Sequence, residues 1–171
     1  MSDYKPFPKR KRTRLQGYDY ALPGMYSITI CTWNRTEIFG SILNGKVTLS
    51  AAGLIARMCL QELPHHYPNL RLDEFVIMPD HVHMILILDS RGPVLDRPLP
   101  DDPAESPTPA SVSEIVRAFK SFASRRMHEM NLLLDQPVWQ RGMNDRIIRD
   151  QAELLAKRDY IRINPLRKAD N

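Results

Sequence analysis

Two histidines, His81 and His83, are separated by one apolar residue inside a long apolar run from Phe75 to Leu88. A run this rich in Val, Ile, Leu and Phe predicts a buried strand, and side chains alternate along a strand, so both imidazoles share one face. Buried ring nitrogens need partners. A shared metal ion is the simplest partner for two such rings, although an isolated His-x-His pair more often consists of ordinary core or edge residues.

A second pair, Tyr160 and Asn164, lies four residues apart, which places both side chains on one face of a helix. Together with the histidines they indicate a specific chemistry. His81, His83 and the Asn164 amide oxygen would hold Mg²⁺ or Mn²⁺ and leave positions open for phosphate oxygens. The cation would polarise a phosphodiester that Tyr160 attacks as the nucleophile. Zn²⁺ or Cu²⁺ would also suit two imidazoles, and plain packing and helix-ending roles are the alternatives for Tyr160 and Asn164.

The elements that must position these residues follow from periodicity and turn signals. Strands are predicted at 25–32, 38–43, 46–49, 70–78, 82–88, 138–141 and 146–149. The Asn44-Gly45 turn joins the second and third of them as a hairpin. The strand at 82–88 is apolar on both faces, which predicts a central place in its sheet.

Three helices complete the pattern. The first is capped by Ser50 and is predicted at 51–63, where Pro64 ends it. The second opens at the capping-box pattern Ser111–Glu114. The third is predicted at 151–163 and ends at Asn164 because a proline follows.

Length and composition fit one compact domain, with 171 residues of which 43% are apolar. We predict a flexible basic arm at 1–17, a domain at 18–166 with a Pro-rich acidic loop at 90–110, and a tail at 167–171. No apolar run approaches the ~18 residues of a membrane span, and the charged N-terminus is unlike a secretory signal, so a cytoplasmic protein is expected. Cys31 and Cys59 are then expected to be reduced core thiols.

The distribution of basic residues is compatible with a nucleic-acid partner, since the net charge is +4 and the first 14 residues are strongly basic. A basic stripe on the second helix would suit a phosphodiester backbone, although a solvated face is the simpler interpretation. The candidate DNA contacts are Lys9, Arg10, Lys11, Arg12, Arg14, Arg117, Lys120, Arg125 and Arg141.

The stretch from Phe75 to His83 resembles the HUH motif of single-tyrosine insertion-sequence transposases. With Val138-Trp139-Gln140 and the stretch from Asp159 to Pro165, it is most similar to the REP-associated branch, over about residues 18–166. The segment 141–146 departs from many relatives, which carry a tyrosine and histidines there. That absence favours Tyr160 as the nucleophile.

The resemblance implies a ferredoxin-like α+β sandwich whose central antiparallel sheet carries the His-Val-His strand. It implies an enzyme that binds single-stranded DNA hairpins of palindromic repeats, nicks them, and stays joined to the 5′ phosphate through Tyr160. In this resemblance His81, His83 and Asn164 match the metal ligands. It leaves monomer and homodimer open, and it implies association with the bacterial nucleoid. A catalytically inactive nucleic-acid-binding module and a metal phosphodiesterase that uses water are the alternatives.

Overall fold

The architecture is a doubled β-α-β unit, and the computed structural model describes residues 19–89, 110–133 and 136–169 of it. Four antiparallel strands form the sheet in the order β4-β5-β1-β6. They are β1 (Gly24–Cys31), β4 (Leu70–Met78), β5 (His81–Leu88) and β6 (Asn144–Ile148). Helix α1 (Ala51–His66) lies between β1 and β4 in the chain, and α2 (Val112–Glu129) lies between β5 and β6. This is the ferredoxin-like arrangement predicted, and β5 is an inner strand as expected.

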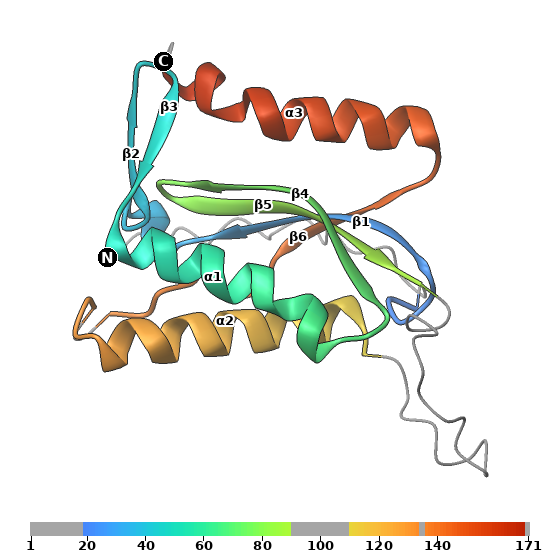
Figure 1. Ribbon diagram of the computed structural model, residues 1–171, viewed down its shortest axis with the longest axis horizontal. Helices are drawn as coiled ribbons and strands as arrows, with labels where there is room; N and C mark the ends of the chain where they lie inside the picture. Colours follow the sequence, from blue (N-terminus) through green and yellow to red (C-terminus); the bar gives the residue numbers. More distant parts are fainter. Residues whose placement is uncertain (1–18, 90–109, 134–135, 170–171) are drawn as a thin grey trace, which may run out of the picture.

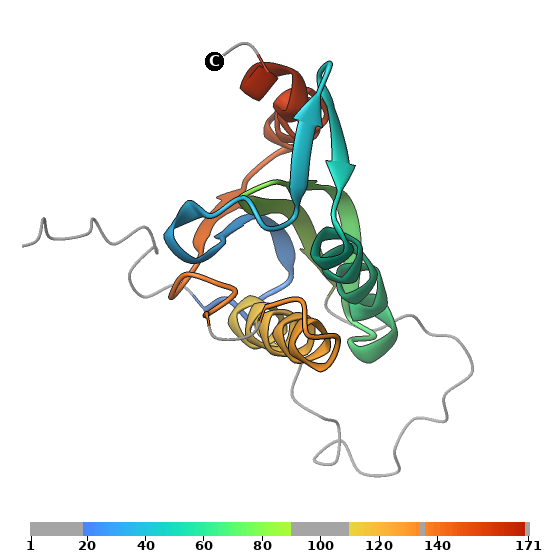
Figure 2. The same ribbon diagram turned by 90° about the vertical axis from the view of Figure 1, so that its left-hand side faces the viewer.

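The two faces of the sheet are covered by different helices. Figures 1 and 2 show α1 and α2 on one face and α3 (Gln151–Ala169) on the other. The larger core lies under α1 and α2 and receives Val82, Met84 and Leu86 from β5. A smaller cluster under α3 receives Ile85 and Ile87 from the same strand. Because side chains alternate along β5, the predicted parity is confirmed, and the two histidines lie on the face that α3 covers.

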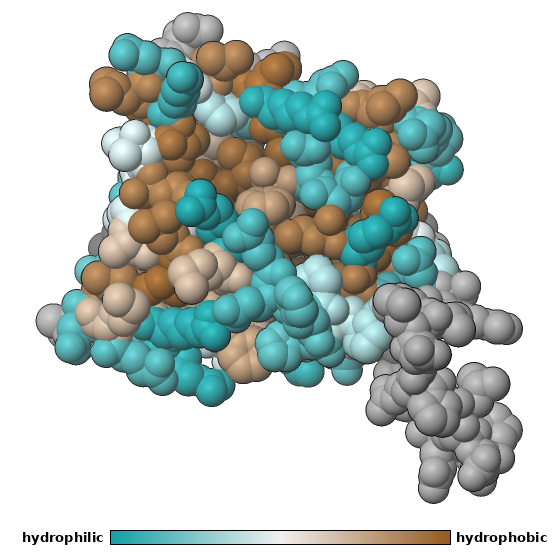
Figure 3. Space-filling view, in the orientation of Figure 1, coloured by the Kyte–Doolittle hydropathy of each residue, from teal (hydrophilic) through white to brown (hydrophobic). Residues whose placement is uncertain are grey.

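A hairpin of β2 (Gly40–Leu43) and β3 (Lys46–Leu49) is inserted between β1 and α1 and rises beside the end of α3 (Figure 1). Its turn residue Gly45 has φ +70°, and a Cβ atom there would lie 2.5 Å from the Leu166 side chain. Hydrophobic patches along this left-hand side are visible in Figure 3. The hairpin turn therefore holds the last turns of α3 at close range.

The helix ends predicted at prolines were wrong. Helix α1 continues through Pro64 to His66, and α3 continues through Pro165 to Ala169, so Asn164 lies inside the helix. Proline removes one backbone hydrogen bond and disfavours a helical preceding residue, but it does not forbid helix. Contact of Leu166 with the hairpin accompanies the continuation of α3.

Other predicted elements are confirmed or shifted. The Ser50 cap and the Ser111–Glu114 capping box are both present. The strand predicted at 138–141 is reduced to one bridge between Thr32 and Trp139, and β6 starts two residues earlier than the extended piece predicted at 146–149. Cys31 and Cys59 are buried free thiols. The basic arm and almost all of the Pro-rich loop lie outside the described residues. Within those residues, none of the helices has the length and apolar character needed to cross a membrane.

Candidate active site

Helix α3 brings its polar pair over the two histidines of β5. The ring centroid of Tyr160 lies 5.5 Å from that of His83, and the Asn164 amide nitrogen lies 3.5 Å from His81 Nε2. Four residues of helix rise about 6 Å and two residues of strand about 6.6 Å. The spacing of one pair therefore matches the spacing of the other, and the structure brings together all four residues that the sequence singled out.

His81 is oriented by the residue that precedes it. Asp80 is buried, and its Oδ1 lies 2.8 Å from His81 Nδ1. The same carboxylate pairs with Arg35 at 3.3 Å. A carboxylate accepts the Nδ1 proton of a neutral imidazole, which leaves the lone pair on Nε2. His81 Nε2 is the atom that faces Asn164, so Asp80 leaves a lone pair directed toward that side chain.

A strained turn supplies Arg35. The short 3-10 helix η1 (Trp33–Arg35) follows β1, and both Asn34 and Arg35 have positive φ, at 51° and 58°. Residues other than glycine seldom adopt this left-handed conformation, and such residues gather at functional sites. The backbone is held there by hydrogen bonds from Thr32 N to the Asp80 carbonyl and from Trp33 N to the Val138 carbonyl.

His83 is held by hydroxyls from β1. Thr29 Oγ1 lies 3.0 Å from its Nδ1, and Ser27 Oγ lies 3.3 Å from its Nε2. Burial, the neighbouring His81 and the Lys157 ammonium lower the pKa of His83 from 6.5 to about 4. The ring is therefore neutral at pH 7, which is the protonation state that a metal ligand requires.

The buried neutral His83 predicts a pH-dependent stability for the metal-free protein. Between pH 4 and 6.5 the unfolded chain holds a proton on this ring that the folded chain does not hold. The free energy of unfolding should therefore rise with pH across that window, by about 3 kcal/mol from this group alone. Urea titrations in the presence of a chelator measure it, and His83→Gln should flatten the rise. An equal rise in His83→Gln and wild type would contradict the assignment.

The two α3 residues differ in exposure. Asn164 is buried, at 8%, whereas the Tyr160 side chain is 37% exposed and accessible to a strand of substrate. Amide oxygen and nitrogen are assigned by their contacts, so turning the Asn164 amide by 180° presents its oxygen to the position beside His81. Lys157 lies one turn before Tyr160, with its ammonium 5.9 Å from the phenol ring centroid.

Helix α3 is held in this position by two ion pairs to the edge strand. Arg158 makes a bidentate pair with Asp73, at 2.6 and 2.8 Å, and Arg162 pairs with Glu74 at 2.8 Å. The β4 ladder is irregular between Leu72 and Phe75, where the two acidic residues lie. The hydrogen bonds that the Arg158 guanidinium donates to Asp73 lower the pKa of this carboxyl group. The bulge therefore aims two carboxylates at the helix that carries Tyr160.

These side chains could supply some, but not all, of the ligands of a divalent metal ion. Asn164 of α3 lies beside His81, and His83 lies beside Tyr160. Asp80 occupies the far nitrogen of His81, and hydroxyls of β1 lie beside the two nitrogens of His83. In the described part of the chain, no group of three His, Cys, Asp or Glu side chains could hold a metal ion. The candidate site thus depends on Asn164 as its third ligand, and a divalent cation bound there would keep open positions for substrate oxygens.

Asp80 gives a direct test of this arrangement. In Asp80→Asn the side chain keeps its shape but loses the negative charge. That charge orients the His81 ring and makes it a stronger electron donor. We expect the affinity for Mn²⁺ to fall about 10–100-fold, measured by isothermal titration calorimetry. Asp89→Asn is the matched control, because it makes the same change at an exposed position just after the far end of β5. Equal affinity in Asp80→Asn and wild type would contradict the orienting role.

The candidate DNA contacts lie in different places. Arg117 and Arg125 are on α2, on the face of the sheet opposite to Tyr160. Lys120 is also on α2, but its ammonium donates hydrogen bonds to the carbonyls of Gln140 and Gly142, and it thereby anchors the segment after Trp139. Arg141 is exposed in that segment. Lys9, Arg10, Lys11, Arg12 and Arg14 lie outside the described residues.

Several residues of the site were missed by the sequence interpretation. Asp80 was not singled out, although a carboxylate next to a candidate ligand is a signal for an orienting partner. Lys157 had a signal too, since it lies three residues before Tyr160 on the same helix. Thr29 and Ser27 share one parity of a strand, but only the pairing of β1 with β5 shows that this parity meets His83.

Comparisons with known proteins agree with this fold. The chain is 35% identical to an uncharacterized protein of Haemophilus influenzae over 92% of this chain and 88% of that protein. No protein-family model matches it. A solved REP-associated tyrosine transposase bound to a REP hairpin is similar in structure, with a TM-score of 0.59 and 18% identity, over 91% of this chain and 73% of the other. A candidate transposase from Deinococcus radiodurans has a TM-score of 0.51 and 18% identity, over 87% and 95%. At this identity the two structures establish a shared fold.

Proposed function

The chain belongs to the same family as the uncharacterized Haemophilus influenzae protein, and we propose that it is a metal-dependent DNA nicking and joining enzyme. Its substrate in this proposal is single-stranded DNA folded as a palindromic-repeat hairpin, cleaved through a 5′-phosphotyrosine intermediate. The fold shared with a transposase bound to such a hairpin supports the choice of substrate. The observation that carries the proposal is the placement of Tyr160 and Asn164 directly over His83 and His81.

The Tyr160 phenol is the group that attacks. Its oxygen forms a bond to the phosphorus of the scissile phosphodiester, the phenolic proton passes to water, and the bond from phosphorus to the 3′ oxygen breaks. The products are a 5′-phosphotyrosine and a free 3′ hydroxyl, and the reverse reaction with another 3′ end joins strands. The Lys157 ammonium lies beside the attacking ring, 5.9 Å from its centroid.

The remaining residues position this reaction. His81, His83 and Asn164 would hold a divalent cation, Mg²⁺ or Mn²⁺, which supplies charge stabilisation for the phosphoryl oxygens when bound. Asp80 and Thr29 fix the two imidazole rings. The Arg158–Asp73 and Arg162–Glu74 pairs hold α3 at the distance that attack requires.

A gel experiment tests the proposed function. A hairpin oligonucleotide labelled on either side of the expected nick is incubated with the protein and Mn²⁺, then separated under denaturing conditions. The proposed chemistry gives two products. The label on the 5′-phosphate side of the nick appears in a protein–DNA adduct, and the label on the other side appears in a shortened strand with a 3′ hydroxyl. Cleavage without an adduct would instead indicate attack by water. Binding without any cleavage, at every metal tried, would indicate an inactive DNA-binding module.

A further inference from the structure

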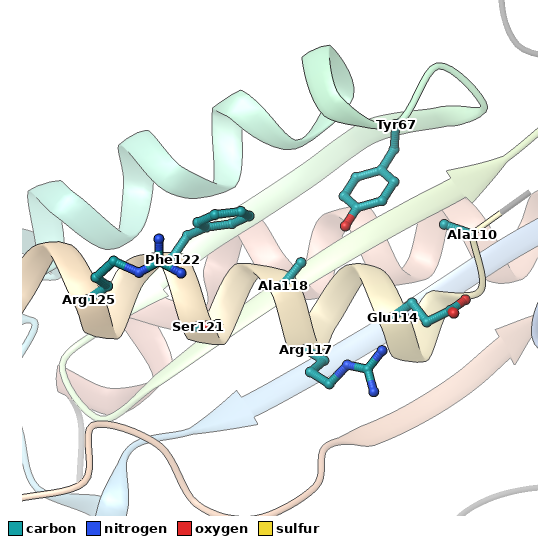
Figure 4. A pocket seen from close by; sticks show the side chains of 8 residues that line it. All are labelled: Tyr67, Ala110, Glu114, Arg117, Ala118, Ser121, Phe122 and Arg125. Atoms are coloured by element: carbon teal, nitrogen blue, oxygen red, sulfur yellow. The ribbon is translucent and has the colours of Figure 1, made fainter. Parts of the chain in front are cut away.

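A groove lies between α1 and α2, on the face of the sheet opposite to Tyr160. Figure 4 shows it running along α2 from Ala110 to Arg125, with the Tyr67 ring across from the helix. Its volume is about 540 Å³. The small side chains of Ala118 and Ser121 line it between the ends, so the middle of the groove is open to a flat ligand.

One end of the groove is a stack of flat groups. The rings of His66 and Phe122 are stacked, with centroids 6.0 Å apart and planes 21° apart. The Arg125 guanidinium carbon lies 5.5 Å from the Phe122 centroid. Phe122 remains 40% exposed although it is a large apolar side chain on a helix with a well-buried face. Planar groups of this kind are what proteins use to stack on the bases of single-stranded nucleic acid.

The charge of the groove favours a phosphate backbone. Among the described residues, neither Arg117 nor Arg125 forms an ion pair with an acidic side chain. Arg126, which follows Arg125, does pair with Glu62 of α1, at 2.8 Å. Arg117 and Arg125 are eight residues apart, about 12 Å along the helix, which is the length of about three to four stacked nucleotides. The one acid in the lining, Glu114, is engaged by the backbone and hydroxyl of Ser111.

We propose that the α1–α2 groove is a second contact site for single-stranded DNA, separate from the cleavage site. A base continues the stack of His66 and Phe122, and Arg117 and Arg125 contact phosphates of the same strand that are about three to four nucleotides apart. The inference rests on the proposed function, because it takes the same DNA strand as the ligand. As a consequence, DNA contacts both faces of the protein. The site under α3 cleaves the DNA, and the groove along α2 binds a flanking single-stranded segment.

Binding measurements without cleavage test the groove alone. A fluorescein-labelled hairpin with a ten-nucleotide single-stranded flank is titrated with the full chain in EDTA, and anisotropy is followed at several salt concentrations. Phe122→Leu should bind about tenfold more weakly, because it keeps apolar bulk but loses the ring. Affinity for DNA falls as salt rises. In the double variant Arg117→Gln, Arg125→Gln the plot of log affinity against log salt should be less steep, by about 1.4.

Control measurements make the outcome decisive. Arg57→Gln removes an equally exposed arginine of α1 that does not line the groove, and it should bind like wild type. Thermal melting of each variant checks that the fold is kept, and the arginine variants carry the test if Phe122→Leu is destabilised. Wild-type affinity and salt slope in the arginine variants would overturn the inference.

The result is independent of the cleavage chemistry. If the variants bind poorly while the wild type forms no covalent adduct, the groove stands and the proposed enzymatic function fails. If adduct forms normally and groove variants bind like wild type, the groove alone fails.

Discussion

Replacing Tyr160 by phenylalanine should abolish the protein–DNA adduct and reduce strand cleavage by at least about 10³-fold. The loss of a covalent nucleophile removes the bond-forming atom itself, and no other group in the site can replace it at comparable rate. The substitution deletes one oxygen from a side chain that is 37% exposed, so the phenylalanine ring keeps its packing against His83. The measurement is the adduct band on a denaturing gel, with wild type and variant at equal concentration.

The adduct experiment has a matched control in the same fold. Tyr26→Phe removes a phenolic oxygen on the opposite face of the sheet, where it donates a hydrogen bond to the Leu22 carbonyl. It should form adduct like the wild type once DNA is saturating. Affinity for uncleaved hairpin, measured in EDTA, should be the same for Tyr160→Phe and wild type within about twofold. Adduct formation by Tyr160→Phe at the wild-type rate would remove Tyr160 from the proposed mechanism.

Replacing His81 by alanine should have the second-largest effect, with Mn²⁺ affinity reduced by more than about 100-fold and adduct formation lost at micromolar metal. Losing a ligand costs more than losing the residue that orients it, for which about 10–100-fold is typical. The variant should keep its fold, because His81 lies at the start of β5 and the core residues of that strand are elsewhere. A loss of adduct can then be attributed to the lost metal ligand. Isothermal titration calorimetry with Mn²⁺ measures the affinity.

High metal concentration and a distant histidine provide the controls. Millimolar Mn²⁺ should partly restore adduct formation to His81→Ala if the residue acts through the metal. His128→Ala, on the exposed side of α2, should leave Mn²⁺ binding and adduct formation unchanged. Unaltered Mn²⁺ affinity in His81→Ala would place the metal somewhere other than beside β5.

Local patterns predicted much of the secondary structure because they report local physics. Alternation along β5 predicted its two faces, and the cap residues of α1 and α2 predicted where those helices begin. Helix ends at prolines were predicted less well. The energy of one lost hydrogen bond at Pro165 is small enough for packing of the following turn against the hairpin to outweigh it. The sequence carries the local preference, but not the contact that overrides it.

The four residues of the candidate site were singled out from their spacing together with the resemblance to HUH transposases, since strand and helix periods place two histidines on one face and Tyr160 with Asn164 on another. Only the tertiary structure decided that these faces meet, because α3 packs on the side of the sheet that α1 and α2 leave uncovered. The supporting residues could not be identified in the same way. Thr29 contacts a histidine 54 residues away, and Arg158 pairs with Asp73 across 85 residues; only Asp80, adjacent to His81, had a local signal. The local sequence therefore determines which reactive side chains are present. Long-range packing determines the distances between them, on which their reactivity depends.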